Sequence, residues 1–230
     1  MRKELLASVV AVMVAISATA QTTPDLPNAD LQKQMKEMED MKPKFGIKAG
    51  YNMAKLTGSD VNFSPDMKNG FMVAASFSPG ARSGLGYRTE LVFSRQGFGF
   101  DENGGQTTVT SDYLYLPQFT TFGIGKLVQL HLGAQLGYLL KSSKESSTGG
   151  SSEDITSFAN RFDYGAAGGV EVFPIKRLIL GGRYNISFGN AYERMTNGST
   201  GTPSPFPLPF NPDEVKGKNA VINFYVGFRF

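Results

Sequence analysis

The last thirteen residues of the chain, 218–230, alternate between two kinds of side chain. Every second position from Ala220 to Phe230 is apolar, and three of these positions are Phe. The positions between them carry mostly Asn, Gly and Arg. A period of two is that of a β-strand whose two faces meet different surroundings. The apolar face would meet a protein core in a soluble sheet, or lipid in an outer-membrane barrel.

The same alternation recurs upstream and predicts seven further strands. The eight expected strands span residues 45–53, 71–77, 85–96, 109–123, 128–140, 162–172, 178–188 and 218–230. The alternation is weakest around Pro117, which cannot donate to a strand ladder and therefore predicts a bulge or an edge position.

The connections between these strands alternate in length, as in outer-membrane barrels with short periplasmic turns and longer outer loops. We expect long loops at 57–69, 97–108, 141–156 and 190–216, and short turns at 78–83, 123–126 and 173–176. No apolar run after the N-terminal segment approaches the roughly 18 residues of a membrane helix, so a closed barrel is the remaining way to span a bilayer. The predicted fold is all-β, an eight-stranded antiparallel up-and-down transmembrane β-barrel. A soluble barrel or sandwich is the alternative.

The N-terminal residues predict export. Arg2 and Lys3 precede an apolar run that ends at an Ala-Thr-Ala site, so residues 1–20 form a predicted secretory signal peptide. Residues 21–44 are a predicted periplasmic linker with a short amphipathic helix, for which a plug, a partner helix and a disordered tail remain open. Residues 45–230 are then the barrel domain. The predicted location is the outer membrane of a Gram-negative bacterium.

Composition removes several classes of function. The chain has no Cys and one His, so neither disulfides nor a metal-ligand spacing is available. Its formal net charge is +3, without a basic run interleaved with aromatics, so nucleic acid is not an expected partner. No pair of glycines opens a helix after a strand, as a phosphate cradle would. We therefore expect neither a cofactor nor a metal.

The mixed faces of the strands predict a polar barrel interior. Eight strands enclose a space that side chains fill, so these groups should pair with one another rather than line a conduit. The predicted interior residues are Lys48, Arg88, Glu90, His131, Gln135, Arg161, Asp163, Glu171, Arg183, Asn185, Asn223 and Arg229. No Ser, Asp or Glu has the spacing that would make His131 a catalytic base, which favours a structural His and a protein that is not an enzyme.

The outer loops are better candidates for function, because binding groups concentrate on loops held by a rigid scaffold. Phe206, Leu208 and Phe210 lie among prolines. They predict either a contact with a protein partner or a segment folded back over the barrel mouth.

Several motifs resemble the PorT-like family of outer-membrane β-barrels. They lie at residues 45–52, 113–117, 132–140, 162–165 and 182–185. The resemblance implies a barrel of the OmpA/OmpX kind over residues 45–230, although Tyr115 stands where similar proteins usually carry an acidic residue. The terminal aromatic Phe230 resembles the signal read by the barrel-insertion machinery.

The resemblance does not imply one activity. We expect a structural or interaction role through the outer loops, with outer-membrane lipid as the surroundings. The founding member is tied to protein secretion, so a component of a secretion assembly, with a periplasmic or extracellular protein partner, is the alternative. Lipid A palmitoyltransferases and deacylases are eight-stranded barrels that use a His, which makes a lipid-modifying enzyme the least favoured hypothesis.

Overall fold

The computed structural model describes residues 42–57, 65–80, 85–102, 105–125, 127–146, 152–192 and 217–230. The predicted signal peptide, nearly all of the predicted linker, and the loop residues Phe206, Leu208 and Phe210 lie outside these ranges.

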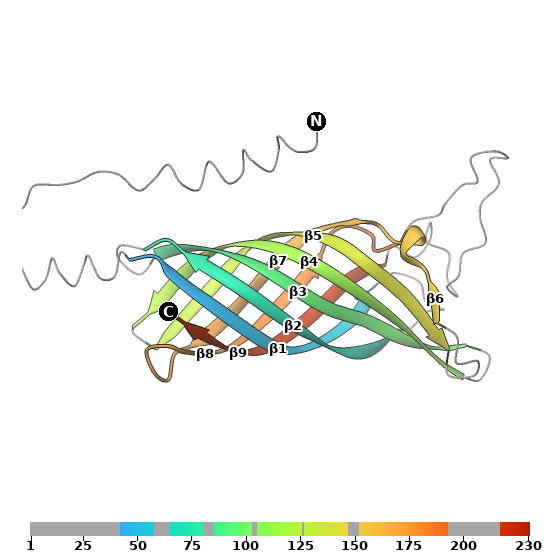
Figure 1. The fold of residues 1–230 in the computed structure, drawn as a ribbon, viewed down its shortest axis with the longest axis horizontal. Helices are drawn as coiled ribbons and strands as arrows, with labels where there is room; N and C mark the ends of the chain where they lie inside the picture. The colour runs from blue at the N-terminus through green and yellow to red at the C-terminus, as the bar shows by residue number, and fades with distance from the viewer. Residues whose placement is uncertain are drawn as a thin grey trace, which may run out of the picture. The chain divides into compact units, whose positions relative to one another are not determined.

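The described residues form a closed ring of eight antiparallel strands (Figure 1). The elements are β1 (Lys44–Thr57), β2 (Asp66–Ser78), β3 (Leu85–Glu102), β4 (Gly105–Ile124), β5 (Val128–Ser146), β6 (Ser152–Asp154), the 3-10 turn η1 (Thr156–Phe158), β7 (Phe162–Val172), β8 (Leu178–Ser187) and β9 (Lys218–Arg229). Each ring strand pairs with the next in sequence, and β1 pairs with β9 to close the ring. Strand β6 is a short addition beside β5. The predicted up-and-down barrel is confirmed.

The outer surface of the ring is apolar on every strand. Exposed hydrophobic side chains include Phe45, Phe71, Leu91, Leu116, Leu132, Phe162, Leu180 and Phe224, one from each of the eight strands. The neighbouring inward positions on β5, for example His131 and Gln135, are buried. An apolar face this extensive suits a hydrocarbon environment. The soluble alternative is wrong, because these side chains point away from the protein interior. No helix among the described residues is long and apolar enough to cross a membrane.

The loop predicted at residues 97–108 is wrong. Strands β3 and β4 stay paired up to Glu102 and Gly105, so their connection is short. The alternation continues here, but the apolar side chains now point inward and the polar ones outward. Phe98 and Val109 are buried inside the ring, whereas Gln106 on the outside is exposed. Strand β5 likewise continues to Ser146, through the first part of another predicted loop.

Pro117 does not lie at an edge, since β4 pairs with β3 on one side and β5 on the other. Its missing N–H coincides with a gap in the β3–β4 pairing, whereas Gln135 of β5 still faces it. The bulge between β4 and β5 lies nearby. There the register shifts between Asp112 and Tyr113.

The interior at the end with the long connections is mainly apolar, with a few buried hydroxyls such as Ser111 and Ser142. Its buried side chains include Phe98, Phe100, Val109, Tyr113, Leu139, Ile155, Ala159, Ala191 and Tyr192, which we call the apolar plug. The segment around η1 folds inward, since the N–H of Ile155 donates to the carbonyl of Ser142 at 3.0 Å and Ala159 bridges to Tyr192. Burial raises the pKa of the Tyr192 phenol to about 12, so it stays neutral at physiological pH.

Candidate functional site

Five charged side chains meet in the half of the interior nearest the short turns. Lys48 of β1, Arg88 and Glu90 of β3, Glu171 of β7 and Arg183 of β8 form what we call the charged cluster. Their side chains are at most 5% exposed. They lie at inward-facing positions of four different strands. A closed ring directs all such positions toward one axis, and the five side chains therefore meet.

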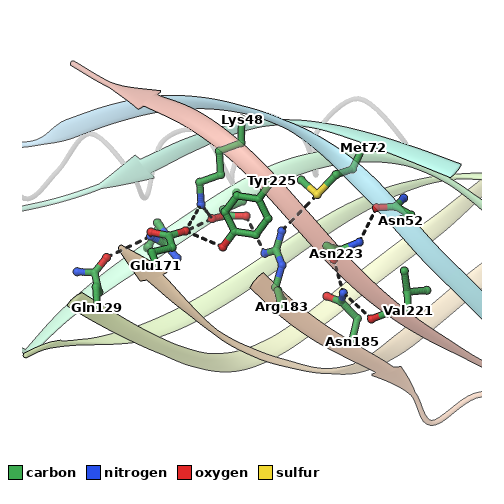
Figure 2. Close-up of polar contacts among 12 residues, drawn as sticks. Lys48, Asn52, Met72, Gln129, Glu171, Arg183, Asn185, Val221, Asn223 and Tyr225 are labelled. Atoms are coloured by element: carbon green, nitrogen blue, oxygen red, sulfur yellow. Dashed lines mark hydrogen bonds and ion pairs between the residues drawn. The ribbon is translucent and has the colours of Figure 1, made fainter. Parts of the chain in front are cut away.

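Each carboxylate of the cluster contacts more than one cation. Lys48 Nζ lies 2.5 Å from Glu90 Oε1 and 2.7 Å from Glu171 Oε1. Arg88 reaches Glu90 at 3.0 Å and Glu171 at 2.6 Å. Arg183 Nη1 reaches Glu90 Oε2 at 2.8 Å. The hydroxyl of Tyr225 also donates to Glu171 Oε1 at 2.8 Å, and Figure 2 shows Lys48, Glu171 and Tyr225 converging.

The cluster holds three cations and two anions, and aromatic rings adjoin the excess positive charge. Arg183 Cζ lies 5.2 Å from the centre of the Phe119 ring, and Arg88 Cζ lies 5.6 Å from the same ring. Lys48 Nζ lies 5.1 Å from the Tyr225 ring. Such contacts are favourable when the cation is desolvated. The cluster therefore links opposite walls of the barrel and blocks its centre.

A layer of amides lies between the charged cluster and the apolar plug. Asn223 Nδ2 donates to Asn52 Oδ1 at 2.6 Å, and Asn185 donates to Asn223 Oδ1. Asn52 Nδ2 donates to Ser94 Oγ at 2.9 Å. Figure 2 shows this run of amides beside Arg183. Chained amides rigidify an interior when each donor finds an acceptor.

Asp163 anchors the other side of this layer. It accepts hydrogen bonds from the hydroxyls of Tyr115 at 2.8 Å and Ser187 at 2.6 Å. Tyr115 in turn accepts from Gln96 Nε2 at 2.8 Å. Tyr115 thus supplies a neutral donor to Asp163, at the position where the resemblance leads us to expect an acidic residue. The cavity beside this layer has a volume of about 20 Å³, room for about one water molecule.

The structure buries nine of the twelve predicted interior residues. These are Lys48, Arg88, Glu90, His131, Gln135, Asp163, Glu171, Arg183 and Asn223. Asn185 is half-buried and bonded to the same amide layer.

Two predicted residues lie elsewhere. Arg161 is exposed, because it precedes β7 rather than lying in it, and its guanidinium donates to the carbonyls of Leu139 and Leu140. Arg229 lies at the short-turn end, with Cζ 4.4 Å from the Phe173 ring and a hydrogen bond to the carbonyl of Lys176.

The prediction omitted several residues that complete the interior networks. They are Asn52, Ser94, Gln96, Tyr115, Gln129, Ser187 and Tyr225. Six of them share the inward phase of predicted residues on their own strands, so strand phase would have found them. Tyr115 is the exception, because β4 carries no predicted interior residue and alternates only weakly there.

His131 is buried and its ring meets the Phe119 ring edge-on, with centres 4.9 Å apart. Among the described residues neither ring nitrogen has a hydrogen-bond partner. No carboxylate or hydroxyl therefore orients this ring as a catalytic triad would. In the described part of the chain no group of three or more His, Cys, Asp or Glu side chains could hold a metal ion.

Phe230 lies on the outer surface at the short-turn end. Its side chain is 66% exposed and its N–H donates to the carbonyl of Phe45 at 2.8 Å. Its ring also contacts Phe228. The last residue is thus joined to the first strand of the ring.

Comparison with known proteins adds a family and a set of similar folds. A family model described as outer membrane protein beta-barrel domain matches residues 29–193. No curated protein matches the sequence significantly.

Three solved structures illustrate the similar folds. The attachment invasion locus protein Ail of Yersinia pestis is 18% identical, with a TM-score of 0.47 over 83% of this chain and 100% of that one. Neisserial surface protein A is 18% identical, with a TM-score of 0.48 over 81% and 97%. Outer membrane protein W of E. coli is 15% identical, with a TM-score of 0.39 over 82% and 98%.

Proposed function

We propose, from the premise that this chain belongs to the outer membrane protein beta-barrel domain family, that it is a closed, non-enzymatic barrel that binds a partner outside the cell. It is a protein of the Gram-negative outer membrane. The proposal concerns what it does there.

The observation that carries the proposal is the length of three neighbouring strands. Strands β3, β4 and β5 have 18, 20 and 19 residues, whereas a tilted strand crosses the hydrocarbon with about 9–11. On the outer face, Arg95 and Asp112 form two hydrogen bonds of 2.7 Å just beyond the apolar band. We call the paired segments beyond this level, residues 95–102, 105–112 and 141–146, the projecting sheet.

The projecting sheet has its own packed core. The apolar plug fills its inner side, and η1 covers part of it. A sheet fixed in this way presents its outer face without an ordering cost on binding, which favours affinity. Polar outward residues such as Thr108 and Glu145 border a surface groove there. A rigid platform of this kind suits a protein contact better than a mobile loop.

The interior supports a role without transport or catalysis. The charged cluster, the amide layer and the apolar plug occupy successive levels of the ring. His131, the one His in the chain, is buried without an activating partner among the described residues. We therefore place the function on the outer surface.

Site-specific photo-crosslinking in intact cells tests this proposal. A photo-reactive residue at Thr108 should form a covalent product with a surface or extracellular protein. The same residue at Leu132, which is 63% exposed on the apolar band, is the matched control and should form none. Equal products at both positions, or none at Thr108, would contradict the proposal.

The alternative suggested by the PorT-like resemblance is a component of a protein-secretion assembly. Partners would then gather at the short-turn end. Crosslinks from Ile175, an exposed residue of the β7–β8 turn, without crosslinks from Thr108 would favour it. Removing residues 21–43 should then also change the proteins co-purified from membranes. An unchanged set would count against this alternative.

A further inference from the structure

The short-turn end of the ring holds a second polar cavity, with a volume of about 70 Å³. We call it the vestibule. Residues from all eight ring strands and two of their turns line it, including Lys44, Ser76, Arg88, Thr121, Gln129 and Arg229. Its inner wall includes Arg88 and Glu171 of the charged cluster. The vestibule is therefore a pocket that ends at the blocked centre of the barrel.

The lining of the vestibule carries excess positive charge. Lys44, Arg88 and Arg229 are cations, and among the described residues Glu171 is the one acidic residue of the lining. Glu171 is already neutralised, since Lys48, Arg88 and Tyr225 all contact it. A solute in the vestibule therefore meets a field that favours anions.

The guanidinium of Arg88 has two buried nitrogens, Nε and Nη2, that donate no hydrogen bond within the described part of the chain. Arg88 Nη1 donates to Glu171 and to Gln129 Oε1, and its Nε forms an ion pair with Glu90 at 3.0 Å without a hydrogen bond. Its Nη2 is buried and finds no acceptor among the described residues. A buried guanidinium N–H without an acceptor is unfavourable, so an oxygen atom placed there would be stabilised.

Arg229 offers a second guanidinium across the same space. The Phe173 ring and the carbonyl of Lys176 hold it in position. Two guanidinium groups with neighbouring hydroxyl and amide donors match the several acceptor oxygens of a phosphate group.

We propose that the vestibule binds a small free oxyanion of the phosphate class, which enters from the periplasmic side. Arg88 and Arg229 are its principal donors, and Thr121 and Gln129 are neutral donors beside them. The charged cluster prevents the anion from passing further, so the site binds and does not conduct. The free anion is favoured over a lipid headgroup, because the vestibule lies inside the ring while lipid meets the outer face.

The test uses the full chain folded in a non-ionic detergent that contains no phosphate. Unfolding temperature is measured against inorganic phosphate at constant ionic strength, with chloride as the replacing anion. We expect a saturable rise with phosphate and not with chloride. Arg229→Gln should weaken the apparent affinity about tenfold or more, the effect of losing one charge-assisted hydrogen bond.

Matched variants keep the result interpretable. Arg161→Gln removes the same charge from an exposed residue just before β7 and should leave phosphate affinity unchanged. Lys44→Gln, at the start of β1, should weaken it and serves if Arg229→Gln does not fold. No phosphate effect beyond that of chloride, or equal losses in Arg161→Gln and Arg229→Gln, would overturn the proposal. Saturation by a soluble phosphatidic acid but not by inorganic phosphate would assign the site to a lipid headgroup and also overturn it.

Discussion

At the residue scale, the interior is governed by the cost of isolating a buried charge. Glu90 contacts Lys48, Arg88 and Arg183, so it is the principal counter-ion of the charged cluster. Breaking a buried pair by removing one partner leaves an uncompensated charge, which is far more destabilising than losing an exposed pair.

Glu90→Gln should therefore destabilise the barrel strongly. The variant leaves three cations against Glu171 alone, and we expect a loss of about 3–5 kcal/mol in the free energy of unfolding. Urea-induced unfolding in detergent micelles measures it. Asp112→Asn is the control, because it breaks the Arg95–Asp112 pair on the outer face and should cost about 1 kcal/mol or less. Equal losses in both variants would contradict the role given to Glu90.

His131→Leu should leave stability unchanged or raise it by about 1 kcal/mol, since it removes a buried polar ring that has no described hydrogen-bond partner. Leu fills a similar volume beside Phe119 and Gly169. The same urea titration measures stability, and mass spectrometry of lipid A from the host membrane checks for an activity. A large loss of stability, or altered lipid A, would refute the structural role of this His.

Strand phase predicts the inward side of most interior residues, Arg161 excepted, but not which of them meet. Lys48 and Glu171 are 123 positions apart in sequence and contact each other only through ring closure. Tyr225 was placed on the correct face, yet its hydrogen bond to Glu171 depends on space left by Gly181, where an added Cβ would lie 2.4 Å from the Tyr225 ring. Pairings of this kind need the strand order and the shear of the barrel, which a single sequence does not give.

At the element scale, strand ends were harder to predict than strand centres. The polar outward residues beyond Arg95 imitate a loop, although Phe98 and Phe100 continue the inward alternation. The β4–β5 bulge also had a local cause that periodicity misses. Leu140 has no register partner in β4, and both Leu140 and Lys141 are exposed, so two consecutive residues face outward.

Polar side chains interrupt the outer apolar band of β3 and β4, and Gln118 is the largest of the uncharged amides and hydroxyls on β4 there. Gln118 lies between Leu116 and Phe122 along the outer face of β4, both of which are exposed. It accepts a hydrogen bond from the Tyr87 hydroxyl, and its Nε2 donates to Thr89 Oγ1 at 2.9 Å. These bonds satisfy the amide at a depth where water is scarce.

The triple variant Tyr87→Phe, Thr89→Val, Gln118→Leu should stabilise the barrel by about 1 kcal/mol, because it replaces a hydrogen-bonded polar group in hydrocarbon with apolar side chains and leaves no donor of that group unpaired. Unfolding in lipid vesicles measures the change. Thr108→Val, on the projecting sheet outside the band, is the control and should have little effect. Destabilisation of the triple variant would show that this face packs against something other than lipid.

At the scale of the whole molecule, the barrel has no open bore, because it has only eight strands and because side chains fill its interior at three levels. Eight strands give a diameter that side chains can fill. The charged cluster lies nearest the short turns, the amide layer follows, and the apolar plug fills the level of the projecting sheet. These levels lie in series, so opening one of them leaves the other two in place.

Purified barrel in a planar bilayer should therefore show no steady stepwise ion conductance. The same sample should migrate differently on a gel when boiled and unboiled, which demonstrates that the silent protein is folded.

Glu90→Gln gives the sharper form of this prediction. It loosens the charged cluster, yet it should remain silent in any folded fraction, because Phe98, Ile155 and Tyr192 of the apolar plug still fill the ring further along. Steady conductance in folded Glu90→Gln, but not in wild type, would show that the charged cluster is the sole barrier. Conductance in folded wild type would show that the barrel is a channel, and its function would then lie in the interior rather than on the projecting sheet.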